Sequence, residues 1–165
     1  MQTPSIGFVS HPCTLGHALV AGTPRGVCFV RFGKDAAHLE AELKRSFPAA
    51  RFERATSGGV SSWGRAVADY VDGRASTAEL PLDVRGSQFE QRVWKALREI
   101  PAGETRSYSE IARRLGRPNG ARAVASAVNA NPAPVAIPCH RVTLKSGGLT
   151  GGAYQRAMLQ REGAM

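Results

Sequence analysis

The chain has 165 residues, of which 42% are apolar, a size and composition that suit one domain or two small ones. No apolar run approaches the roughly 20 residues of a membrane helix, and the first 16 residues lack the basic start and apolar core of a signal peptide. Three scattered cysteines, Cys13, Cys28 and Cys139, are too few for a disulfide framework and lack zinc-site spacing. We therefore expect a cytoplasmic protein with no membrane contact, no bound metal and no other cofactor.

The net positive charge of the chain lies almost entirely in its second half. Residues 1–84 hold 9 Lys and Arg against 8 Asp and Glu, whereas residues 85–165 hold 13 against 5. This asymmetry favours a polyanionic partner, above all nucleic acid. The alternative is a solvated basic surface that keeps the chain soluble, and charge alone does not decide between the two.

The first half predicts a small α/β scaffold domain over residues 1–84. Two apolar runs on either side of the turn signal GTPRG predict a hairpin over residues 17–33. Apolar residues at helical spacing predict helices over residues 35–48 and 61–73, each followed by a helix-ending Pro or Gly. Residues 78–84 fit a short strand or an extended linker. No candidate chemistry appears in this half.

Two capping boxes open helices in the second half, a mostly helical domain over residues 85–165. Ser87 and Glu90 precede apolar residues at helical spacing, and the sequence PAGET then ends that helix. Ser107 and Glu110 open a shorter helix, YSEIARRLG, whose final glycine suits a helix C-terminus. The chain as a whole is therefore predicted to be an α+β protein.

A third, alanine-rich helix follows over residues 120–131. Together with the preceding short helix and the turn RPN it resembles a helix-turn-helix, although most helix pairs bind no DNA. Helical spacing turns Val124 and Val128 inward and puts a second set of residues on the other side: Arg122, Ala125, Ser126 and Asn129. Small residues around one long side chain suit a minor groove, whereas the alternative is a helix packed inside the protein.

The stretch VAIPCHRVTL places Cys139 and His140 side by side. A cysteine thiol has a pKa of about 8.5, so it needs a base to act at neutral pH, and a carboxylate can orient that base. In an extended segment the two side chains diverge, which favours proton transfer through a water. Glu162, on a predicted last helix, is the best downstream carboxylate, and Asn131 is expected to tie the turn before the cysteine. The alternative is a buried apolar cysteine.

The motif IPCHRV, with GARAV upstream and Asn131 between them, resembles the O6-alkylguanine-DNA alkyltransferase family. The likeness covers nearly the whole chain, because TLGHALVAGTPRGVCFVRFG and LEAELKRSFPAA resemble the N-terminal domain of the bacterial Ada type. The resemblance implies a ribonuclease H-like N-terminal domain and a C-terminal domain with a winged-helix-like helix-turn-helix. It also implies single-turnover DNA repair, in which one cysteine accepts an alkyl group from O6-alkylguanine after the nucleotide is flipped.

The resemblance also implies a role for each matching residue. Cys139 would accept the alkyl group, His140 would activate it through a water, and Glu162 would support the histidine. Asn131 would hold the turn of the active site.

Further matching residues would bind the substrate. Tyr108 would help to rotate the nucleotide, Arg122 would fill the gap in the duplex, and the Val142 carbonyl would read the guanine amino group. Ala125 and Ser126 would lie against the minor groove. We expect a monomer on double-stranded DNA that carries alkylated guanine, and we leave cooperative binding and activity on O4-alkylthymine open.

One segment departs from the family pattern. After IPCHRV the chain reads TLKSGGLTGGAYQRAML, which is shorter than the family's loop and lacks its aromatic residues, and we do not equate Tyr154 with them. A glycine-rich loop predicts a more open and mobile pocket, with either tolerance of bulkier alkyl groups or weaker lesion binding. Three other functions remain as alternatives: a non-catalytic lesion-binding protein, a thiol hydrolase and a transcription factor.

Overall fold

The computed structural model describes residues 4–75 and 79–165, so residue 78 of the predicted 78–84 segment lies outside the described part. The chain is α+β and divides into two compact units between Val84 and Arg85. The elements of the first unit are β1 (Ser5–Cys13), β2 (Gly16–Thr23), β3 (Gly26–Gly33), α1 (Ala36–Ser46), β4 (Arg51–Arg54) and α2 (Gly59–Val71).

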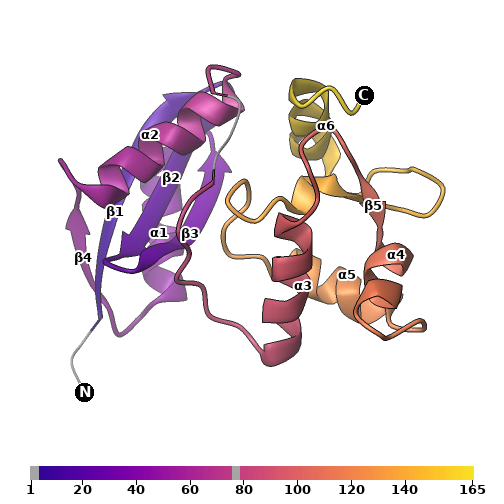
Figure 1. Ribbon diagram of the computed structural model, residues 1–165. Helices are drawn as coiled ribbons and strands as arrows, with labels where there is room; N and C mark the ends of the chain where they lie inside the picture. The colour runs from indigo at the N-terminus through magenta and orange to yellow at the C-terminus, as the bar shows by residue number, and fades with distance from the viewer. Residues whose placement is uncertain (1–3, 76–78) are drawn as a thin grey trace. The chain divides into compact units, whose positions relative to one another are not determined.

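The sheet of the first unit has the strand order β3-β2-β1-β4 (Figure 1). Strands β1, β2 and β3 run antiparallel, which confirms the predicted hairpin, and β4 pairs in parallel with β1. Neither β1 nor β4 was predicted from the sequence. Pro12 interrupts the strand pattern of β1. It lies beyond Ser5–Phe8, the part of β1 that pairs with β4. The missing N–H of Pro12 therefore costs little.

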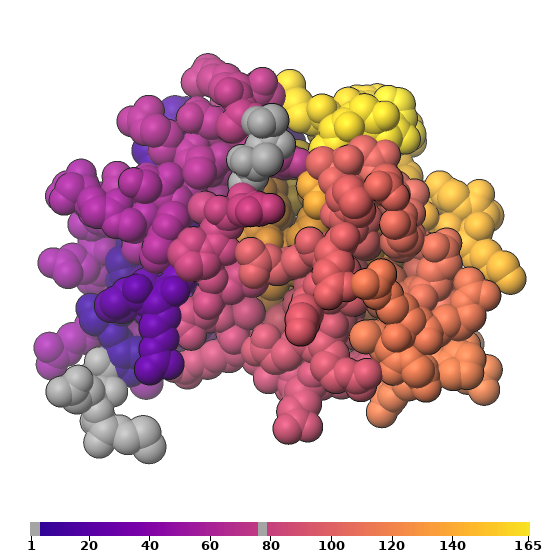
Figure 2. Space-filling model, viewed as in Figure 1, coloured from indigo at the N-terminus to yellow at the C-terminus, as the bar shows by residue number. Residues whose placement is uncertain are grey.

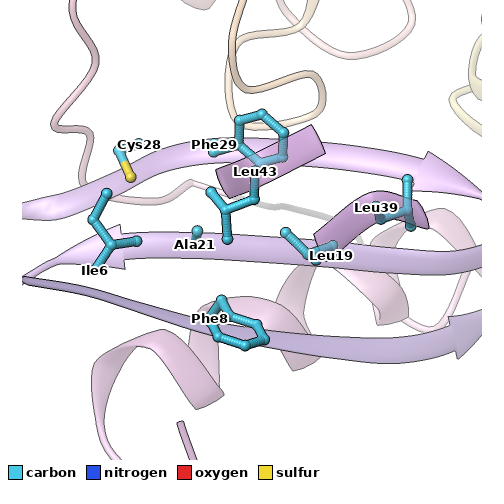
Figure 3. Close-up of a cluster of buried hydrophobic side chains, with 8 residues drawn as sticks. All are labelled: Ile6, Phe8, Leu19, Ala21, Cys28, Phe29, Leu39 and Leu43. Carbon is cyan, nitrogen blue, oxygen red and sulfur yellow. The ribbon is translucent and has the colours of Figure 1, made fainter. Parts of the chain in front are cut away.

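Helices α1 and α2 cover opposite faces of this sheet, as expected for a scaffold with apolar residues on both faces of its strands. Leu39 and Leu43 of α1 pack on Leu19 and Ala21 of β2 in one buried cluster (Figure 3). On the other face, a Cβ atom at Gly22 would stand 2.7 Å from the ring of Trp63 in α2. The sheet therefore comes too close to α2 at this point for any side chain.

The second unit contains α3 (Gln88–Arg98), β5 (Arg106–Ser107), α4 (Tyr108–Arg114), α5 (Ala121–Asn129), the 3-10 turn η1 (Cys139–Arg141), β6 (Val142–Thr143) and α6 (Gly152–Arg161). Both predicted capping boxes are present, at the starts of α3 and α4. In the space-filling view the atoms of α6, yellow, lie at the surface of their unit (Figure 2).

Helix α5 packs on α3 with the face that the sequence predicted. Val124 and Val128 are buried, whereas Arg122 and Ser126 are exposed. The indole N–H of Trp94 in α3 donates to the Ala127 carbonyl over 2.8 Å, inside the core. This bond fixes the position of α5, and with it the outward direction of Arg122.

Two short strands connect the helix-turn-helix region to the cysteine segment. Strands β5 and β6 pair in parallel, with Arg106 opposite Val142 and Ser107 opposite Thr143. Because Tyr108 follows β5 directly and Cys139 lies three residues before β6, this pairing places the two near each other. Within the two described ranges, no helix has the length and apolar character needed to cross a bilayer.

Candidate active site

Cys139 lies in a 3-10 turn, not in the extended segment that we expected. The turn Cys139–Arg141 follows Pro138, whose φ of −78° and ψ of 68° start it. A helix of three residues per turn sends consecutive side chains in different directions. Cys139 is thus partly exposed and faces a cavity, whereas His140 is buried, with 1% of its surface exposed.

His140 is held by a buried carboxylate from the far end of α6. Its Nε2 atom lies 2.9 Å from Oε2 of Glu162, whose side chain is 2% exposed. Both ring nitrogens are buried and lack a hydrogen bond of good geometry among the described residues, so the approach of Nε2 to Glu162 is a close ion-pair contact. The pairing leaves Nδ1 as the nitrogen that can exchange a proton with the neighbouring thiol.

Arg141 holds the same carboxylate from a second side. It donates from Nε to Oε1 of Glu162 over 3.0 Å and from Nη2 to Oε2 over 2.6 Å. Its Nη1 atom donates to the Ile100 carbonyl over 2.8 Å. A bidentate guanidinium contact of this kind is among the strongest charge-assisted hydrogen bonds, so Glu162 has one fixed orientation toward His140.

Asn131 ties the chain just before the cysteine. Its amide nitrogen donates to the Ile137 carbonyl over 2.9 Å, and its amide oxygen accepts from the Ala133 N–H over 2.8 Å. Between these two points Val135 adopts a φ of 77°, a region that β-branched residues rarely occupy. Such strain persists only where surrounding bonds fix the backbone, and Asn131 supplies two of them.

A cavity of about 180 Å³ brings four of the predicted site residues together, because Cys139, His140, Asn131 and Tyr108 all line it. The remaining lining residues are Val128, Asn129, Pro134, Thr150, Gly151, Tyr154 and Gln155. All of them belong to the second unit.

Three predicted DNA-contacting residues lie elsewhere, on the outer side of α5. Arg122 and Ser126 are exposed and Ala125 is half-buried. None of the three lines the cavity. This separation is suited to a protein that binds a large ligand on one surface and holds the reacting group in the cavity.

Val142 lies outside the residues that line the cavity. The residue is 1% exposed. Its carbonyl oxygen already accepts from the side-chain amide of Gln155, over 2.6 Å. A carbonyl has two lone pairs, so reading a guanine amino group there would use the second one.

Sequence reasoning missed Arg141 and also three residues in the loop after β6 or in α6. Thr150 accepts or donates a hydrogen bond of 2.8 Å with the Tyr108 hydroxyl. Tyr154 meets the His140 ring edge-to-face, with centroids 6.2 Å apart. Gln155 was detectable, because it lies seven residues before Glu162 and therefore on the same face of the predicted helix.

The loop is also less open than its glycines suggested. The Leu144 N–H donates to the Gly148 carbonyl over 2.9 Å, and the Thr150 and Gly151 N–H groups both donate to Oε1 of Gln155. No group of His, Cys, Asp or Glu side chains in the described part of the chain is arranged to hold a metal ion.

Comparisons with known proteins identify relatives of this chain. The family model of the 6-O-methylguanine DNA methyltransferase DNA-binding domain matches residues 88–164. The chain is 44% identical over 163 residues to the bifunctional transcriptional activator/DNA repair enzyme Ada of Escherichia coli, covering 97% of this chain and 46% of Ada. It is 37% identical over 139 residues to a methylated-DNA–protein-cysteine methyltransferase of Methanosarcina acetivorans, covering 84% of each.

Solved structures agree as well. The Mycobacterium tuberculosis O6-methylguanine methyltransferase superposes with a TM-score of 0.76 at 32% identity, over 96% of this chain and 93% of that one. A structure of the OGT of the same organism in complex with DNA gives 0.74 at 34% identity, over 97% and 93%. The chain spans about half the length of the first curated relatives that it matches. On these matches over nearly its full length, the chain belongs to the methylated-DNA–protein-cysteine methyltransferase family.

Proposed function

We propose that this protein repairs DNA by moving an alkyl group from O6-alkylguanine to its own Cys139. The observation that carries the proposal is one arrangement: Cys139 lines a cavity beside a buried histidine, and Glu162 holds that histidine at 2.9 Å. The names of the relatives support the same activity, and one relative has been solved with DNA.

Activation of the thiol is the first step. His140 takes the thiol proton, through a bridging water that its unpartnered Nδ1 atom is placed to bind. Glu162 stabilises the imidazolium that forms, and Arg141 keeps the carboxylate in place. The thiolate is a stronger nucleophile than the thiol, so the fraction of thiolate that this proton transfer produces sets the rate of the next step.

Alkyl transfer is a single displacement at carbon. A bond forms between Sγ of Cys139 and the alkyl carbon while the bond from that carbon to guanine O6 breaks. The electron pair stays on the guanine, which takes up one proton in place of the one that the thiol gave to His140, and the unmodified base stays attached to its DNA strand. A thioether is a stable product, so each molecule would act once.

The substrate must leave the duplex before it can reach the cavity. Extruding a nucleotide costs a few kcal/mol, and Arg122, which is exposed on α5, would offset part of this by entering the space left behind. Ala125 and Ser126 are small enough for close approach to the minor groove, and Tyr108, at the cavity, would contact the rotated nucleotide.

Two finer assignments of the fold belong to this proposal. The strand order β3-β2-β1-β4, with three antiparallel strands and one parallel strand, supports a ribonuclease H-like first unit. The helices α4 and α5 beside the β5–β6 pair support a winged-helix-like DNA-binding unit over residues 85–165. The first unit, residues 1–84, would then be a scaffold.

The same proposal covers the setting in which the protein works. We propose that the protein acts as a monomer on double-stranded DNA. The chemistry needs no cofactor, because the thiol is both nucleophile and final acceptor. The three cysteines outside disulfides fit a reducing cytoplasm.

Intact mass tests the proposal directly. The protein is incubated with a duplex that carries one O6-methylguanine, and transfer adds one methylene unit, about 14 Da, which peptide digestion maps to Cys139. The Cys139→Ala variant should bind the duplex without gaining mass. An unchanged wild-type mass together with lesion-selective binding would instead establish a lesion-binding protein.

A further inference from the structure

The side chain of Gln155, in the first turn of α6, makes four hydrogen bonds although it is 2% exposed. Its amide nitrogen donates to the His140 carbonyl over 3.0 Å and to the Val142 carbonyl over 2.6 Å. Its amide oxygen accepts from the Thr150 N–H over 3.0 Å and from the Gly151 N–H over 2.8 Å. Both donor hydrogens and both acceptor lone pairs of this amide are used.

These four bonds join two different parts of the site. The nitrogen holds the backbone on either side of Arg141, in the segment that carries Cys139 and His140. The oxygen holds Thr150 and Gly151, which form part of the cavity wall. Thr150 continues the connection, because its hydroxyl bonds to Tyr108 on the other side of the cavity.

The loop depends on these bonds because it buries little apolar surface. Leu144, at its start, is 43% exposed, and its remaining residues are small or polar apart from Leu149. The backbone also passes directly against Gln155, since a Cβ atom at Gly151 would stand 2.8 Å from the Gln155 Cβ atom. Hydrogen bonds to Gln155, more than side-chain packing, therefore set how far this wall stands from Cys139.

We propose that Gln155 is a positioning residue that sets the size of alkyl group the cavity accepts. Its nitrogen aligns the segment that carries Cys139, and its oxygen holds the wall at Thr150 and Gly151. The inference rests on the proposed alkyl transfer. The two halves of the amide have separable consequences, because loss of the donor affects every substrate, whereas loss of the acceptor affects large and small alkyl groups differently.

Two variants separate the role of the Gln155 amide nitrogen from that of its amide oxygen. Gln155→Glu keeps oxygen acceptors for the Thr150 and Gly151 N–H groups but removes the amide donor. Gln155→Met removes donor and acceptor in a side chain of similar length, so the four backbone partners lose their hydrogen bonds without a large change of shape. Gln160→Met, an exposed position of the same helix, is the matched control. Single-turnover rate constants are measured on duplexes that carry O6-methylguanine or O6-benzylguanine.

We expect both variants to slow methyl transfer and only Gln155→Met to change substrate preference. Its ratio of benzyl to methyl rate should rise about fivefold or more, an effect the size of one lost hydrogen bond, while Gln155→Glu keeps the wild-type ratio. Gln160→Met should match wild type in both rates. An unchanged ratio in Gln155→Met, or the same shift in both variants, would overturn the proposal.

Amide hydrogen exchange of the wild-type protein provides a test that does not depend on the folding of any variant. The Thr150 and Gly151 N–H groups should exchange more slowly than the N–H of the exposed Ser146 in the same loop. Equal exchange would show that Gln155 does not hold the wall. If wild-type protein fails to methylate Cys139, the proposed function is refuted. The exchange pattern would still show whether Gln155 holds the wall, so the two failures are distinguishable.

Discussion

Asn131 and Ile137 are joined by a buried hydrogen bond of 2.9 Å that closes the turn leading to Cys139. The same side chain accepts from the Ala133 N–H, so one residue fixes both ends of the segment in which Val135 has its positive φ. The geometry of the cysteine segment thus depends on a residue eight positions upstream.

Asn131→Ala should therefore destabilise the fold and slow alkyl transfer. It leaves the buried Ile137 carbonyl and Ala133 N–H without this partner, at a cost of about 1–3 kcal/mol in unfolding free energy. Asn131→Asp, which keeps an acceptor for Ala133, should cost less. Denaturant unfolding measures the difference, and Asn119→Ala in an exposed turn is the control, expected within about 0.5 kcal/mol of wild type. Equal stability of Asn131→Ala and wild type would contradict this account.

Glu162→Gln tests the carboxylate behind the histidine. The substitution removes the charge that stabilises an imidazolium at His140, so methyl transfer at neutral pH should slow by about 10²-fold. The matched control is Glu99→Gln, which breaks the exposed pair with Arg114 and should leave the rate within twofold, since surface ion pairs contribute little. Thermal melting of both variants separates lost chemistry from lost folding. A wild-type rate in a folded Glu162→Gln protein would remove Glu162 from the mechanism.

Arg122→Ala tests the step that opens the duplex. Transfer from a duplex should fall about tenfold or more, because nothing then fills the space of the extruded nucleotide. Transfer from free O6-benzylguanine base should be unaffected, since a free base needs no extrusion. Arg65→Ala removes the same charge from the exposed surface of α2 in the first unit and serves as the control. Equal losses on duplex and free base would place Arg122 in the chemistry instead.

Cys13 should react as a slow thiol at neutral pH. Burial raises the pKa of Cys13, and the Asp72 carboxylate adds to the effect, while a backbone hydrogen bond from Leu15 opposes it. A raised pKa means less thiolate at neutral pH, so labelling of Cys13 by iodoacetamide should lag behind that of a free cysteine and catch up only at alkaline pH. Peptide mapping across a pH series measures this. Labelling of Cys13 at pH 7 as fast as free cysteine would show that the pKa is not raised.

The helices of the second unit could be predicted because their signals are local. Ser87 with Glu90, and Ser107 with Glu110, each hold a helix start within four residues, and both capping boxes formed as expected. The outward face of α5 followed from spacing alone. Such features depend on neighbours in the chain and not on the rest of the fold.

The features that escaped prediction depend on contacts between distant segments. Strand β4 has four residues and exists because it pairs with β1, more than 40 residues earlier. The turn at Cys139–Arg141 is fixed from outside, by Gln155 and Glu162 on α6. A local reading of IPCHRV gave the candidate residues Cys139 and His140 but not the directions of their side chains, because contacts with α6 help to set those directions.

If Glu162 supports His140 as proposed, the contact between them makes the reactivity of Cys139 depend on the docking of one helix, α6. Glu162 follows the last turn of α6, and Gln155 begins that helix, so both ends of α6 hold the segment that bears the thiol. Transient detachment of α6 would leave the other helices folded and yet switch the thiol off. The fraction of molecules able to repair DNA at a given temperature would then be the fraction with α6 in place, and activity would be lost on heating before the unit as a whole unfolds.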